Sequence, residues 1–141
     1  MNGAINEKMG TLIEDRAIEE FVNKWCQTEP RLHDKVNAMM AEKGVSLSQL
    51  MSKSQINRNY GYNIINGKRT NPSRDKVLAI CIALKLSLTE TQELLAIAKV
   101  GTLYYRRERD VRIAAAINKA IGDVIKVNLI LAEQGLEPLN M

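Results

Sequence analysis

Residues 57–69 read NRNYGYNIINGKR, and this stretch has the pattern of a short helix with one apolar and one polar face. Ile56, Tyr60 and Ile64 fall one helical turn apart, which places them on the side that faces a core. Gly67 comes directly after the last periodic residue, where a helix C-terminus commonly needs a left-handed residue. The stretch is therefore predicted to be a helix that ends at Gly67 and is followed by two basic residues.

The polar face of this helix carries amide, phenol and guanidinium groups and no carboxylate. At 100° per residue it comprises Asn59, Tyr62, Asn63 and Asn66, with Arg58 at its edge. Arg pairs well with the guanine edge and Asn with the adenine edge in the major groove of DNA. An ordinary solvent-exposed helix face would carry similar residues. The segment before the helix distinguishes a DNA-reading face from such a face.

That segment favours DNA, because it predicts a second short helix directly before the first. Residues 46–49 read SLSQ, which fits a capping box and opens a helix that ends near Ser54; residues 87–90, SLTE, fit a second capping box that opens a later helix. A tight turn around Gln55-Ile56 would join the two helices. Two short helices, the second one polar and basic, describe a helix-turn-helix.

The order of residues in this segment resembles the phage-repressor-like (Xre-type) helix-turn-helix regulators. The resemblance is closest to a bacterial subgroup whose second helix has a sequence like residues 57–69, followed by a segment like NPSRDK at 71–76. The resemblance covers roughly residues 31–140. It implies a transcriptional regulator that binds double-stranded DNA sequence-specifically, as a homodimer. One position departs from the family, because many members have a phosphate-binding Gln where this chain has Leu47.

The resemblance and the chemistry of the polar face together suggest which residues contact DNA. The side chains expected at base edges in the major groove are Arg58, Asn59, Tyr62 and Asn63. The side chains expected at phosphates are Ser46, Ser48, Asn66, Lys68 and Arg69.

Basic charge is concentrated around the predicted helix-turn-helix. Residues 46–76 contain six Lys or Arg residues and one Asp, a net charge of +5, whereas the whole chain carries +4. The rest of the chain therefore has a slight acidic excess. A positive patch that coincides with the motif is the electrostatic footprint expected of a nucleic-acid-binding protein.

The whole chain is predicted to be all-α, because apolar residues recur at helical spacing nearly throughout. Residues 1–28 should hold an N-terminal amphipathic helix, and residues 29–103 a five-helix DNA-binding domain with its helices between Leu32 and Lys99. Residues 104–141 should form a C-terminal extension with helices at 107–119 and 123–134, and this extension could serve dimerisation.

The C-terminal extension resembles the two helices before it. Arg74-Asp75 opens one stretch and Arg109-Asp110 the other, 35 positions later, while residues 94–96 correspond to 130–132. The pattern indicates a repeated helix pair, although common helical periodicity alone could produce it.

Composition and motifs argue against several classes of protein. The chain has one His, two Cys and no Gly-rich phosphate loop, so enzyme activity is not expected, nor is a metal or cofactor. Nor does any small-molecule effector suggest itself. No secretory signal or membrane span is expected, which favours a cytoplasmic location. Cys81, inside an apolar run, should be a buried and reduced thiol.

A second interpretation is a helical interaction module that uses the helix-turn-helix as a scaffold to bind a partner protein. Two predicted helical segments with apolar faces, at residues 9–25 and 111–131, are more than a five-helix DNA-binding domain requires. Either surface could form the subunit contact of a homodimer. The C-terminal pair is favoured because it lies within the resemblance.

Overall fold

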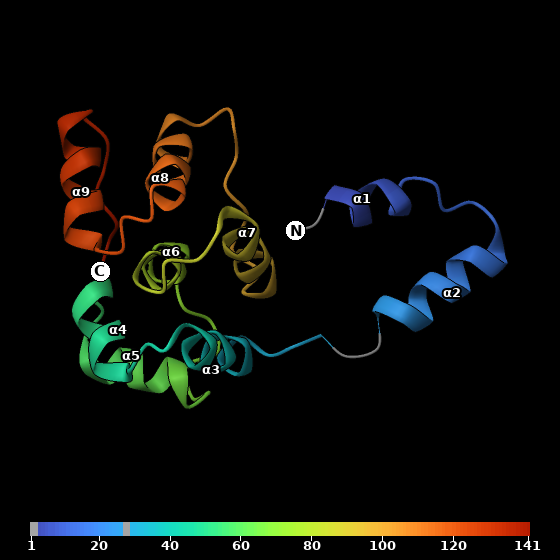
Figure 1. Cartoon of the computed structure of the whole chain (residues 1–141), viewed down its shortest axis with the longest axis horizontal. Helices are drawn as coiled ribbons and strands as arrows, with labels where there is room; N and C mark the ends of the chain where they lie inside the picture. The colour runs from blue at the N-terminus through green and yellow to red at the C-terminus, as the bar shows by residue number, and fades with distance from the viewer. Residues whose placement is uncertain (1–2, 27–28) are drawn as a thin grey trace.

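The computed structural model describes residues 3–26 and 29–141, and within them the chain is all-helical, as predicted (Figure 1). The helices are α1 (Gly3–Met9), α2 (Asp15–Trp25), α3 (Leu32–Lys43), α4 (Leu47–Ser54), α5 (Arg58–Ile65), α6 (Arg74–Ala83), α7 (Leu88–Ile97), α8 (Glu108–Asn118) and α9 (Val124–Glu133). The five helices predicted between Leu32 and Lys99 are α3 to α7.

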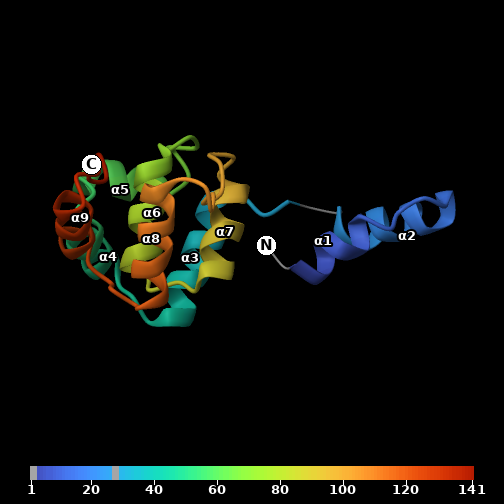
Figure 2. The ribbon, with the colours of Figure 1, turned by 90° about the horizontal axis from the view of Figure 1, so that it is seen from above.

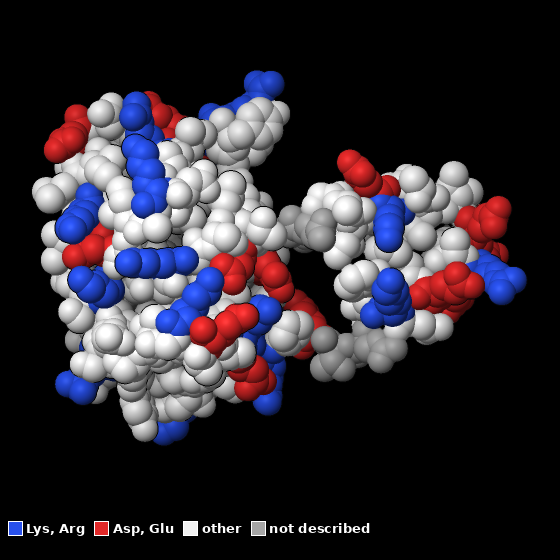
Figure 3. All heavy atoms as spheres, in the orientation of Figure 1, with Lys and Arg blue, Asp and Glu red and all other residues white. Residues whose placement is uncertain are grey.

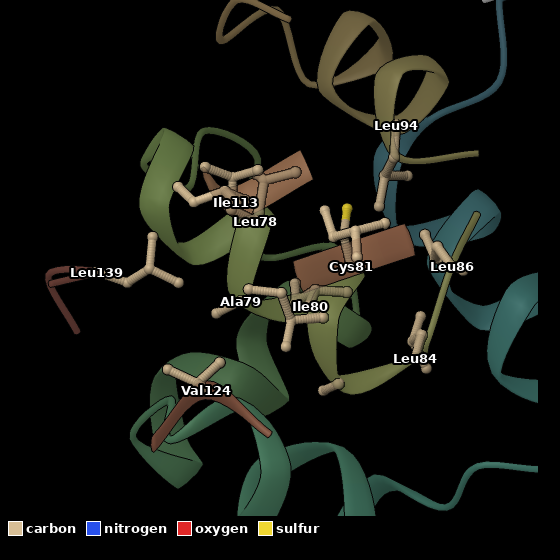
Figure 4. Close-up of a cluster of buried hydrophobic side chains, with 14 of the residues drawn as sticks. Leu78, Ala79, Ile80, Cys81, Leu84, Leu86, Leu94, Ile113, Val124 and Leu139 are labelled. Carbon is tan, nitrogen blue, oxygen red and sulfur yellow. The ribbon is translucent and has the colours of Figure 1, made fainter. Parts of the chain in front are cut away.

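Helix α6 is the centre of the packed body that α3 to α9 form. Every residue from Val77 to Leu84 is buried, so this helix is apolar all round, as a central helix must be. It contacts α4, α7 and α9. Figure 4 shows side chains from several helices gathered around it, namely Leu78, Ile80 and Cys81 with Leu94, Ile113 and Val124. Burial raises the pKa of the Cys81 thiol to about 12, so this thiol is buried as predicted and stays protonated.

Local capping interactions set the starts of two helices in the body. Ser46 Oγ accepts a hydrogen bond from the Gln49 N–H (3.1 Å), and Gln49 Oε1 accepts one from the Ser46 N–H (2.9 Å). Ser87 and Glu90 make the same reciprocal pair at the start of α7. Both capping boxes were predicted from the sequence, and each satisfies two backbone donors that a helix start leaves open.

The N-terminal segment contains two helices where the sequence predicted one. Helix α1 ends at Met9, Gly10 and Thr11 form a turn, and α2 begins at Asp15. Gly10 has a low helix propensity, and the Thr11 hydroxyl donates to the Lys8 carbonyl oxygen (2.7 Å), so the backbone leaves the helix here. The rest of the predicted segment, residues 1–2 and 27–28, lies outside the described residues.

The predicted repeat is present, and the two helix pairs exchange ion pairs reciprocally. The Arg74 guanidinium binds both oxygens of Asp110 (3.0 and 2.8 Å), and the Arg109 guanidinium binds both oxygens of Asp75 (3.2 and 3.1 Å). Each arginine of one helix pair thus meets the aspartate of the other. This is the pattern of a pseudo-two-fold relation between α6–α7 and α8–α9.

The two arginines also bind backbone carbonyls at equivalent positions of the repeat. Arg74 Nε donates to the Gly101 oxygen (3.1 Å), and Arg109 Nε donates to the Glu137 oxygen (2.9 Å), 36 positions later. The apolar residues of α8 and α9 that face inward are buried in the same core as those of α6 and α7. The C-terminal pair is therefore packed onto the body, and most of its apolar surface is already used within the chain.

Candidate nucleic-acid interface

The turn that joins α4 to α5 is held by two buried side chains, Ser54 and Ile56. Gln55 adopts a left-handed conformation (φ 61°), which turns the chain sharply after α4. The buried Ser54 Oγ accepts a hydrogen bond from the N–H of Ile56 (3.3 Å), and the Ile56 side chain is itself buried. Asn57 then caps α5, because its Oδ1 accepts from the Asn59 N–H (3.0 Å). The predicted helix-turn-helix is therefore formed, with its angle held by side chains in the turn.

The inner side of α5 packs closely against α4. Ile64 is fully buried, as the apolar stripe predicted. Gly61 is buried too, and a Cβ atom added there would lie 2.1 Å from Met51 Sδ. A glycine in a helix interior costs about 1 kcal/mol relative to Ala, and this close approach of the Met51 side chain explains its presence.

The outer side of α5 carries the side chains predicted to reach base edges. Arg58 and Asn59 are exposed, as is Tyr62 (56%), and Asn63 is half-buried. Helical geometry places all four within one sector of the helix surface. Among residues 3–26 and 29–141, no acidic side chain pairs with Arg58. The face is thus polar, largely open and positively charged at its N-terminal end.

The chain beyond α5 turns back on the helix and keeps its basic side chains outside. Gly67 is left-handed (φ 83°), as predicted. Asn66 Oδ1 accepts from the Lys68 N–H (3.0 Å), and the Arg69 N–H donates to the Asn63 carbonyl oxygen (2.8 Å). The side chains of Asn66, Lys68 and Arg69 remain exposed. Three of the predicted phosphate-contact residues therefore gather on one anchored turn.

The other two predicted phosphate-contact residues, Ser46 and Ser48, lie at the N-terminal end of α4 and are exposed. The Ser46 oxygen already accepts the capping hydrogen bond, which leaves its hydroxyl proton available as a donor. A helix N-terminus also carries partial positive charge from its backbone amides. The chemistry at this end of α4 suits an anion.

Tyr60 has a role that the sequence did not reveal. Its ring lies under two cations, with the Arg69 guanidinium 4.6 Å and the Lys76 ammonium 4.7 Å from the ring centroid. Cations over an aromatic face are attracted by the quadrupole of the ring. The half-buried Tyr60 thus joins the core to the basic turn and restrains both cations. The apolar spacing predicted the inward position of Tyr60, but the contact with Lys76 of α6 required the fold.

Helix α3 supports the C-terminal end of α5. Asn37 Nδ2 donates to the Ile65 carbonyl oxygen (2.9 Å), and the His33 ring lies against Gly67, where an added Cβ would be 2.8 Å from Cε1. The His33 side chain is only 24% exposed, because its ring packs on the turn after α5. Neither Asn37 nor His33 carried a sequence signal for this contact.

No group of three or more His, Cys, Asp or Glu side chains could hold a metal ion among residues 3–26 and 29–141. Within the same residues, every helix is too short or too polar to cross a bilayer.

Comparison with known proteins identifies the family of this segment. Residues 35–99, which run from the first turn of α3 to just beyond α7, match the family model of the Cro/C1-type HTH DNA-binding domain. No curated protein and no solved structure gives a significant match. The matched residues include the whole of α4, the turn after it and α5. Residues 35–99 of this chain therefore form a phage-repressor-like helix-turn-helix DNA-binding domain of the Cro/C1 type.

Proposed function

We propose that the protein is a sequence-specific transcriptional regulator that reads the major groove with α5 and acts as a homodimer at a promoter or operator. The observation that carries this proposal is the two-sided character of α5. On its inner side Ile64 is buried in the core and Gly61 lies against Met51 of α4, while its outer side presents amides, a phenol and a guanidinium. A rigid helix with an open polar face is what direct readout requires.

The proposed contacts divide into base reading and phosphate binding. Arg58 suits the O6 and N7 acceptors of guanine, and the amides of Asn59 and Asn63 suit adenine. Tyr62, the most exposed aromatic residue of α5, would touch the neighbouring base or sugar. The remaining proposed contacts, to phosphates, come from Ser46, Ser48, Asn66, Lys68 and Arg69.

Binding to duplex DNA over a range of salt concentrations tests the proposal. Affinity for random duplex should fall steeply as salt rises, because bound cations release condensed counterions. Lys68→Ala should weaken specific and random binding alike and flatten the salt slope by about one unit. Arg58→Ala should cost about 1–3 kcal/mol on the best site and relax the preference at one base pair. A matched control is Lys119→Ala, which removes an exposed cation at the end of α8.

A different result would refute the assigned roles. If Arg58→Ala lowers affinity equally for every sequence, Arg58 does not read a base. If the wild-type protein fails to bind duplex DNA at low salt, the second candidate function gains support. That candidate is a helical module that binds a partner protein, and the exposed apolar side chains of α2 favour it.

A further inference from the structure

Helix α2 carries an apolar stripe that no residue among 3–26 and 29–141 covers. None of its side chains is buried, and Trp25 is 47% exposed. Ile18, Val22 and Trp25 fall at helical spacing, so the three exposed side chains form one continuous stripe, with Phe21 beside it. An exposed stripe of this kind commonly marks an interaction surface.

A groove on the body offers a matching apolar surface. It lies between α7 and α8 and has a volume of about 280 Å³. Most of its lining is apolar or aromatic, from Leu88, Leu103, Tyr104, Tyr105, Val111 and Ala114, and two polar residues, Gln92 and Asp110, complete it. Tyr105 is 76% exposed and Val111 is 46% exposed.

The charges beside the two surfaces are complementary. Arg106, Arg112 and Glu108 line the hollow that adjoins the groove, and Glu108 pairs with Arg112 (3.2 Å). Arg107 stacks over the Tyr104 ring 5.5 Å from its centroid. Residues 104–112 contain four Arg and two acids, so this edge of the groove keeps a net charge of +2. Residues 14–20, by contrast, contain four acids and one arginine. Figure 3 shows Lys and Arg side chains over α8 and at the loop before it, and acidic side chains on α2. The flank of the stripe is acidic where the rim of the groove is basic.

We infer that α2 is an arm whose apolar stripe seats in the α7–α8 groove of a second copy of this chain, with Trp25 and Val22 against Tyr105 and Val111. Both ribbon views place α2 beyond α3, away from helices α7 and α8 of its own chain (Figures 1 and 2). A two-fold pair of chains would make this contact twice, which doubles the buried area and leaves no open binding surface. The inference specifies the subunit contact of the homodimer and to that extent rests on the proposed function.

Two charge-introducing variants at exposed positions test the arm, one on each side of the contact. Val22→Asp alters α2 and Val111→Asp alters the groove, while Leu129→Asp, at an exposed position of α9, is the matched control. Light scattering without DNA measures the dimer, and circular dichroism checks the fold. Each test variant should weaken dimerisation at least tenfold, and the control should not.

Mixing the two test variants gives the sharpest readout. A heterodimer of Val22→Asp with Val111→Asp keeps one intact contact, between the wild-type arm of one chain and the wild-type groove of the other. The mixture should therefore dimerise more tightly than either variant alone. Trp25 is the only tryptophan, so its emission should shift to the blue as the wild-type protein dimerises.

Several outcomes would overturn the inference. Dimers that survive Val111→Asp but not Val22→Asp would mean that α2 pairs with α2. A monomer whose Trp25 emission changes with Val111→Asp at all concentrations would place the arm in its own groove. A wild-type protein that stays monomeric also refutes it. Binding to random duplex DNA is measured separately and tests the DNA-binding function. The DNA-binding proposal and the arm proposal can therefore fail independently.

Discussion

Replacing Asp110 by Asn tests whether the exchanged ion pairs hold the C-terminal helix pair on the core. The Asp110 side chain is only 3% exposed. It accepts hydrogen bonds from Nη1 and Nη2 of Arg74 and from the Tyr104 N–H (2.9 Å). Breaking a buried ion pair by removing one partner costs about 3–5 kcal/mol. Arg74 is 24% exposed, so water recovers part of its solvation. The expected loss is about 2–4 kcal/mol of unfolding free energy.

The repeat supplies a matched control for this variant. Asp75→Asn removes the equivalent carboxylate, whose side chain is 21% exposed, so it should cost less than Asp110→Asn. Glu108→Gln breaks a surface pair with Arg112 and should cost at most about 1 kcal/mol. Urea unfolding followed by circular dichroism gives all three values. Equal losses for Asp110→Asn and Glu108→Gln would refute the argument from burial.

The same carboxylate predicts a dependence of stability on pH. Burial opposes the ionisation of Asp110, but the hydrogen bonds from Arg74 and the Tyr104 N–H and the Arg74 charge outweigh it, so the pKa of Asp110 lies below its usual range. A depressed pKa in the folded state stabilises the protein above the unfolded value of about 3.9. This stability is lost as pH falls through the folded pKa. The difference between wild type and Asp110→Asn should therefore shrink as pH drops below about 4.

Three further variants test the packing around α5. Ile64→Ala should cost about 2–5 kcal/mol, and a near-neutral thermal midpoint would mean that the inner face of α5 is misplaced. In the wild-type protein Gly61→Ala should be destabilising, because the added Cβ would meet the Met51 side chain. In a Met51→Ala protein the same change should be stabilising, by up to about 1 kcal/mol. Equal effects of Gly61→Ala in the wild-type and Met51→Ala proteins would contradict the contact. Gly67→Ala should cost about 1–3 kcal/mol, because φ is positive there and the added Cβ would meet the His33 ring; His33→Ala should relieve only the part of the loss that comes from the ring.

Features that depend on residues close together in the sequence were predicted correctly. Ser46 with Gln49 and Ser87 with Glu90 are three residues apart, and Gly67 needed only the helix period before it. These signals act within one turn of helix, so they do not need the tertiary structure. The same holds for the ends of α8 and α9, which lie within one residue of their predicted positions.

Features that depend on distant residues were missed or remained open. The repeat was visible as two Arg-Asp pairs, but their reciprocal contact depends on how the helix pairs face each other. The position of Lys76 over Tyr60 likewise requires α6 to lie beside α5. The prediction of one N-terminal helix was wrong for another reason. Apolar residues recur at every fourth position across Gly10, so the pattern gave no sign that the backbone turns there.

The central claim is that α5 reads DNA sequence as part of a two-fold pair. Its most direct test is the selection of bound fragments from a pool of random duplex DNA. The wild-type protein should enrich a palindromic consensus whose half-sites are about 10–10.5 base pairs apart, centre to centre, or a multiple of that spacing. Arg58→Ala should enrich the same palindrome with the preference relaxed at one base pair in each half-site. A pool without a consensus, or an Arg58→Ala consensus identical to that of the wild type, would contradict the account.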